Sequence, residues 1–89
     1  MNKNHCPVCG YKDIVVLDEF NCTTFEICEC CGNESGLEYH NFTPEVDILK
    51  LRQEWFIKNK CEWWGEKSSI PKNWNPVKQL QAVGLYPPE

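Results

Sequence analysis

The chain has 89 residues, seven of them cysteines, and a formal net charge of −4. A domain of this size buries only about 60 to 65% of its unfolded surface, so we expect an additional cross-link to support its core. Residues 1–10 are polar and the longest aliphatic run, 14–17, is four residues, which argues against a signal peptide and a membrane-spanning segment. We therefore expect a cytoplasmic protein whose cysteines bind metal in preference to forming disulfides.

Charge is distributed unevenly along the chain. Residues 1–43 carry a net charge of −5, whereas residues 44–89 carry +1. Four thiolates on one divalent ion would add about −2 to the first half. Because binding of duplex DNA depends on lysine and arginine contacts to phosphates, we expect negligible binding of random duplex DNA at physiological salt.

The first predicted element is a hairpin that begins after a tight turn at residues 6–10. Residues 11–20 and 23–27 contain β-branched and aromatic side chains typical of strands, and the polar stretch 18–22 is suited to turn the chain between them. Antiparallel pairing would bring the cysteines before and after this hairpin to the same end.

Cysteine spacing in this region predicts a metal site. Cys6 and Cys9 are separated by two residues, as are Cys28 and Cys31, with 18 residues between the pairs. This pattern is typical of zinc bound by four cysteines, where each short turn supplies two sulfurs to one tetrahedron. The sequence therefore predicts one structural Zn²⁺ per chain, with iron as an alternative occupant of the four thiolates.

Each cysteine pair is followed by a glycine, Gly10 or Gly32, which can adopt a positive φ and let the turn curl. Cys30 could replace one ligand of the second pair. We prefer Cys28 and Cys31 because that pair repeats the spacing and the following glycine of the first turn.

Over residues 5–32 the chain resembles the zinc-ribbon superfamily, and its two turns resemble those of rubredoxin. More loosely, it is similar to small cysteine-rich bacterial proteins with Cys-Pro-Cys-Cys turns, although here the proline is Pro7 of the first turn and the doubled cysteine is in the second. The ribbon resemblance implies a metal-stabilised interaction module in transcription, translation or larger complexes.

A helix is predicted within residues 43–64, with its regular part over about 44–59. Thr43 is the candidate N-cap, Pro44 suits the first helical position, and Gly65 marks a stop. An apolar arc, interrupted by Arg52 and Asn59, would cover the ribbon. Its members are Ile48, Leu49, Leu51, Trp55, Phe56 and Trp63.

Residues 65–89 are predicted to form an irregular extension that wraps the same core, with a short helix at 76–83 closed by Gly84. The expected fold is thus a small α+β metal-bound domain over 1–89: a zinc-ribbon β-hairpin in 1–42, a covering α-helix in 43–64, and the C-terminal extension.

Four tryptophans follow the ribbon. We expect Trp55 and Trp63 to pack in the core, whereas Trp64, adjacent to Trp63, would point about 100° away from it on a helix. Trp64 and Trp74 then predict an interaction surface distinct from the metal turns, with Lys67 and Lys72 as its polar rim. The alternative is that the extension folds back and buries both rings.

The remaining cysteines are Cys22, Cys30 and Cys61, which we interpret as buried filler or, alternatively, as a thiol switch near the metal. His5 and His40 are interpreted as surface histidines, with a role as alternative ligands left open. Nucleophile–base patterns and phosphate-binding loops are not recognisable in the sequence, so we do not expect an enzyme.

The predicted function is that of a structural-zinc protein-interaction module of a small bacterial-type cytoplasmic protein. Two alternatives remain: a nucleic-acid-binding zinc ribbon that uses the lysines of the C-terminal half, and a thiol or metal sensor. Salt dependence separates the first two, because phosphate contacts weaken steeply with salt and a tryptophan-centred interface does not.

Overall fold

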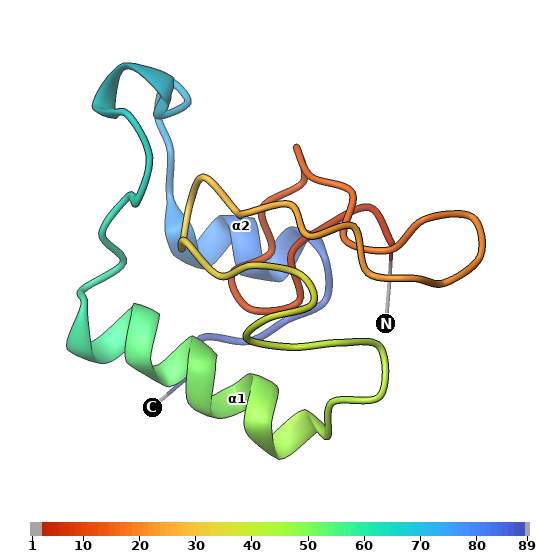
Figure 1. The fold of residues 1–89 in the computed structure, drawn as a ribbon. Coiled ribbons are helices and arrows are strands. Elements are labelled where there is room, and N and C mark those ends of the chain that lie inside the picture. Colours follow the sequence, from red (N-terminus) through yellow and green to blue (C-terminus); the bar gives the residue numbers. More distant parts are fainter. Residues whose placement is uncertain (1–2, 89) are drawn as a thin grey trace.

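The computed structural model describes residues 3–88. Its helical elements are α1 (Glu45–Gln53), the π-helical turn η1 (Glu54–Lys58) that continues it, the short 3-10 turn η2 (Lys67–Ser69), and α2 (Pro76–Ala82). In Figure 1, α1 and α2 lie against the looped N-terminal half, drawn red to yellow, and the cyan segment between them extends away from the body. The domain is therefore small and loop-rich, with two short α-helices.

The strands expected at 11–20 and 23–27 do not form. Within residues 3–88, β pairing consists of three isolated bridges: Leu17 with Thr23, Ile27 with Glu34, and Ser35 with Tyr39. A regular ladder does not form because Val16 bonds two different segments: its N–H donates to the carbonyl of Lys3, and its carbonyl accepts from the N–H of Thr24. Phe25 then leaves the extended conformation at φ 60°. The hairpin turn at 18–22 is nevertheless present, closed by the first bridge.

The covering helix, α1 followed by η1, ends at Lys58, within one residue of the predicted end of its regular part at 59, and residues 59–64 of the predicted segment are not helical. Lys60 and Cys61 both have positive φ, 52° and 58°, which reverses the chain. The indole N–H of Trp55 donates to the carbonyl of Glu62 at 3.2 Å and holds this reversal. Ending the helix early brings Trp63 into the core.

The beginning of α1 also differs in detail from the prediction. Pro44 is the N-cap and Glu45 the first helical residue. The hydroxyl of Thr43 accepts a hydrogen bond from the backbone N–H of His40 at 2.8 Å, so it stabilises the preceding turn instead of the helix.

Helix α2 matches its prediction closely. Asn75 Oδ1 accepts from the backbone N–H of Lys78 at 3.0 Å, Pro76 occupies the first turn, and Gly84 follows the helix with φ 78°. Pro76 and Gly84 are the local signals that predicted a short helix at 76–83, and the Asn75 cap is a further signal that the structure adds.

One hydrophobic core joins the cysteine turns to both helices. Trp55 and Trp63 are buried as predicted, whereas Leu49 of the predicted arc is 40% exposed. The buried members of the core are Cys6, Val8, Cys9, Ile14, Val16, Leu17, Cys28, Cys30, Tyr39, Ile48, Trp55, Trp63 and Leu80. Four of these residues are cysteines: Cys6, Cys9 and Cys28 of the predicted site, and Cys30 beside it in the second turn. The stability of the core therefore depends on the chemistry of those thiols.

Candidate metal centre

Two turns of the same geometry present the cysteines. In the first, the N–H of Gly10 donates to the carbonyl of Cys6 at 2.9 Å; in the second, the N–H of Gly32 donates to the carbonyl of Cys28 at 2.7 Å. Both glycines have positive φ, 83° and 80°, which allows this curl without a Cβ clash. The local sequence Cys-x-x-Cys-Gly therefore folds in the same way twice.

The two turns bring four sulfur atoms together from segments about 20 residues apart in the sequence. The Sγ atoms of Cys6, Cys9, Cys28 and Cys31 all lie within 4.8 Å of one another. The Sγ of Cys6 is 3.7 Å from that of Cys31, and the Sγ of Cys9 is 3.5 Å from that of Cys28. A sulfur tetrahedron around zinc, with bonds of about 2.3 Å, has edges of about 3.8 Å, so the group fits a tetrahedrally bound ion.

The site is largely shielded from bulk water. Cys6, Cys9 and Cys28 are fully buried and Cys31 is partly buried. Burial raises the pKa of the Cys9 thiol well above its usual value, because a lone thiolate is poorly solvated there. A cation at the centre of the four sulfurs would supply the positive charge that lets these thiols lose their protons.

Cys30 is not part of the four-sulfur group, in agreement with the preferred ligand set. It is fully buried, and its Sγ lies 3.4 Å from the amide nitrogen Nε2 of Gln79 on α2. The same Nε2 donates to the carbonyl of Cys9 at 2.9 Å, and Gln79 Oε1 accepts from the indole of Trp74 at 2.8 Å. Gln79 thus ties both cysteine turns to the C-terminal extension.

Arg52 holds the first turn from the side of α1. Its guanidinium is buried, with Nε 2.8 Å from the carbonyl of Val8 and Nη2 2.7 Å from that of Pro7. Burial lowers the pKa of Arg52, opposed by the nearby charge of Glu45. The sequence analysis treated this residue as an interruption of the apolar arc, whereas the structure makes it the polar contact at the centre of that arc.

Further polar groups lie close to the sulfurs. Asn33 Nδ2 is 3.2 Å from the Sγ of Cys31. The hydroxyl of Tyr39 is buried and has no hydrogen-bond partner among residues 3–88. Burial, followed by the charges of Cys6 and Cys31, raises the pKa of Tyr39 far above its usual value. The Asn33 amide is a donor of the kind expected around a cluster of thiolates.

The second turn is covered by the segment that contains Trp64. The backbone N–H groups of Trp64 and Gly65 donate to the carbonyls of Cys30 and Glu29, at 2.9 and 2.8 Å. The indole of Trp64 lies directly on Gly32, where a Cβ atom would come within 2.4 Å of the ring. Trp64 is nevertheless 59% exposed, so a binding surface around it stays a prediction, although that surface would adjoin the second metal turn.

Trp74 is placed differently from Trp64. Its ring packs edge-on against Trp63 at a centroid distance of 5.3 Å, and Trp63 in turn contacts Tyr11 at 5.5 Å. With its indole N–H bonded to Gln79, Trp74 is partly buried against the core. Of the predicted rim, Lys67 lies 3.9 Å from Glu62 in an exposed ion pair, and Lys72 is exposed. Of the four predicted interface residues, Trp64, Lys67 and Lys72 are therefore exposed and Trp74 is partly buried.

Neither histidine joins the sulfur group. His5 lines a pocket beside Arg52 and Leu85, and burial lowers the pKa of its imidazole. His40 is exposed, accepts a hydrogen bond from the N–H of Phe42 at its Nδ1, and contacts the Phe42 ring.

The three cysteines outside the sulfur group differ in exposure, which gives the first testable prediction. Cys22 is exposed, Cys61 is partly buried with its thiol directed at the carbonyl of Phe56, and Cys30 is fully buried. Burial also raises the pKa of Cys61 and lowers its thiolate fraction. In metal-loaded protein, N-ethylmaleimide should therefore modify Cys22 first, Cys61 more slowly and Cys30 last, as followed by peptide mass spectrometry. Modification of Cys30 ahead of Cys22 would contradict this order.

Comparison of the chain with protein-family models, with curated proteins and with solved structures finds no match. The helices of residues 3–88 are all too short or too polar to cross a lipid bilayer. Functional interpretation therefore depends on the geometry of the site and on the surface around it.

Proposed function

We propose that this chain is a protein-interaction module built on a zinc-ribbon-like metal centre. One Zn²⁺, held by Cys6, Cys9, Cys28 and Cys31, would fix the two turns on which the surrounding loops are mounted. The observation that carries the proposal is the convergence of four sulfurs, three of them on fully buried cysteines of the core.

The chemistry of the donors favours a structural role for the metal. Four protein ligands complete a tetrahedral shell, which leaves no position for water or a substrate. Thiolate sets suit zinc and also iron, so iron is the competing occupant. The amide of Asn33, which lies against the sulfur of Cys31, would stabilise thiolate charge with either metal.

The support for a binding function comes from the exposed side chains and not from the metal centre itself. Among residues 3–88, eleven large hydrophobic side chains are exposed, which is a large apolar area for so small a domain. Binding of nucleic acid is less well supported. Two of the lysines in the C-terminal half, Lys58 and Lys67, lie beside carboxylates at 3.8 and 3.9 Å.

Metal analysis of freshly purified protein tests the proposal. We expect one zinc per chain by elemental analysis, and tetrahedral tetrathiolate absorption when Co²⁺ replaces it. Cys31→Ser should lose most of the metal, because it removes a ligand, while the matched neighbouring change Cys30→Ser should keep one equivalent. Metal-free native protein would refute the metal-stabilised module. Retention of the ion by Cys31→Ser with loss in Cys30→Ser would refute the ligand set.

A further inference from the structure

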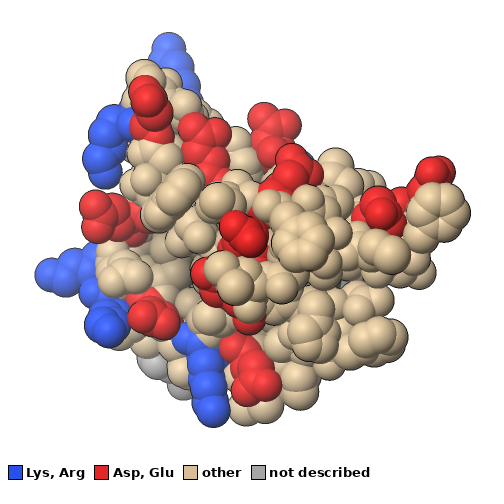
Figure 2. All heavy atoms as spheres, viewed as in Figure 1, with Lys and Arg blue, Asp and Glu red and all other residues tan. Residues whose placement is uncertain are grey.

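A long stretch of the chain lacks basic residues. Residues 13–49 contain nine aspartates and glutamates and no lysine or arginine. In Figure 2 the blue basic side chains gather on the left of the molecule, while the right side is tan and red. The field on that side is therefore negative, as expected of a surface that attracts cationic partners.

Most of the exposed apolar side chains lie in the same stretch. Eight of the eleven large hydrophobic residues exposed within residues 3–88 belong to 13–49. The largest exposures in this group are those of Phe42 at 83%, Phe20 at 78%, Leu37 at 72% and Phe25 at 63%. Aromatic side chains left in water at this level are typical of binding surfaces.

These residues belong to two segments, 18–27 and 34–43, that lie side by side. Asn41 Nδ2 donates to the carbonyl of Asn21 at 3.1 Å and joins the turns that carry Phe42 and Phe20. Nearer the core, the Phe25 ring lies against Gly36, where a Cβ atom would come within 2.6 Å of it. We name these two segments the acidic aromatic face; their acids are Asp18, Glu19, Glu26, Glu34 and Glu38.

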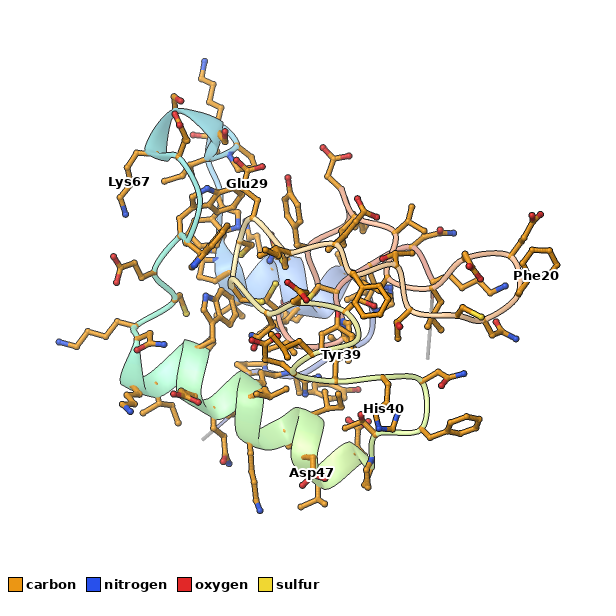
Figure 3. All side chains as sticks on the ribbon, in the orientation of Figure 1. Phe20, Glu29, Tyr39, His40, Asp47 and Lys67 are labelled. Carbon is orange, nitrogen blue, oxygen red and sulfur yellow. The ribbon has the colours of Figure 1, made fainter. Side chains whose placement is uncertain are left out.

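Hydrogen bonds hold both tips of the face in fixed turns. Asp18 Oδ1 accepts from the N–H groups of Phe20 and Cys22, at 2.8 and 2.9 Å. In the neighbouring turn, the backbone N–H of His40 donates to the hydroxyl of Thr43 at 2.8 Å. Figure 3 shows Phe20 at the outer end of its loop, far from Lys67. A partner would therefore meet aromatic rings that are already positioned, which lowers the entropic cost of binding.

We infer that the acidic aromatic face binds a basic segment of a protein partner, one that carries lysines or arginines interspersed with apolar side chains. The apolar side chains would contact Phe20, Phe25 and Phe42, and the cations would pair with the surrounding carboxylates. A nucleic acid is excluded as the occupant by the repulsion between its phosphates and this face.

The inference rests on the proposed function and names the surface that such a module would use. It is tested with zinc-loaded, ¹⁵N-labelled protein and three synthetic peptides of equal length, made of Lys and Leu, of Lys and Ser, and of Glu and Leu. The Lys/Leu peptide should bind, and its amide shifts should fall in residues 18–27 and 34–43. Binding of the Lys/Ser peptide should be at least about tenfold weaker, and that of the Glu/Leu peptide undetectable.

Variants locate the binding surface. Phe20→Ala combined with Phe42→Ala should weaken binding of the Lys/Leu peptide at least about tenfold, since aromatic side chains that become buried on binding contribute most of the affinity of such interfaces. Tyr86 lies outside the face and, like Phe20, is 78% exposed, so Tyr86→Ala should leave the affinity for the Lys/Leu peptide unchanged. Glu19→Gln with Glu26→Gln should weaken binding more at low than at high salt.

The metal content of each sample is measured first. A sample that lacks zinc then counts against the proposed metal-stabilised module, whereas a zinc-loaded sample that does not bind counts against the proposed binding surface. Zinc-loaded protein that ignores the Lys/Leu peptide would refute the inference. So would shifts confined to the Trp64 side, equal affinity of the double phenylalanine variant, or displacement of the peptide from this face by random duplex DNA.

Discussion

Removal of the metal with a strong chelator should unfold most of this domain, and addition of zinc should restore it. The four sulfurs lie in the single core, and among residues 3–88 neither a β-bridge nor a backbone hydrogen bond runs directly between the two cysteine turns, which Gln79 links through Cys9 and Cys30. In zinc-finger peptides a structural ion contributes about 10 to 16 kcal/mol of binding free energy, which is comparable to the whole stability of an ordinary domain, roughly 5 to 15 kcal/mol.

The measurement is the near-ultraviolet circular dichroism of the tryptophans together with thermal unfolding. Loss of metal should abolish the signal of buried Trp55 and Trp63 and the cooperative transition. Cys22→Ser is the matched control, because that thiol is exposed and outside the sulfur group. Chelated protein that unfolds cooperatively at the same midpoint as the zinc form would show that the metal is not structural.

Truncation of Arg52 should have the second-largest effect. Arg52→Ala removes both donors to the carbonyls of Pro7 and Val8, which are buried in the first metal turn. Loss of two charge-assisted hydrogen bonds that leaves buried acceptors without partners should cost about 3 kcal/mol of unfolding free energy. The zinc should also be released faster to a competing chelator, because the first turn is then less well held.

Chemical denaturation of the zinc-loaded proteins and the rate of metal transfer measure these effects. Arg52→Lys should recover part of the stability, since an ammonium group can bond one carbonyl but not span both. Lys50→Ala, an exposed change in the same helix, should alter stability by less than about 0.5 kcal/mol. If Arg52→Ala unfolds at the denaturant concentration of the unmodified chain, the arginine does not support the metal turn.

Local features were determined by the sequence alone. The Cys-x-x-Cys-Gly spacing predicted both turns, and the positive φ of Gly10 and Gly32 agrees with it. Pro76 and Gly84 likewise predicted the bounds of α2 to within one residue. These signals could be read because each turn or helix end is decided by interactions among residues four or five positions apart.

Only the tertiary structure decided how those pieces are joined. Extended pairing failed in 11–27 because Val16 divides its backbone bonds between Lys3 and Thr24, a competition that strand propensity does not describe. Arg52 became a buried contact because its acceptors lie 44 and 45 positions earlier in the chain, at Val8 and Pro7. Its position in the centre of the apolar arc was the only sequence signal of this role.

The tryptophans show the same division. Their number indicated that the second half supplies the core, and Trp55 and Trp63 are buried there. Whether Trp64 is free or lies on a metal turn depended on the reversal at Lys60 and Cys61, and Trp74 was placed by Gln79 and Trp63. Hydrophobicity favours burial of an indole without specifying its neighbour, because the hydrophobic effect has no direction; the neighbour is set by how the whole chain packs around the four sulfurs.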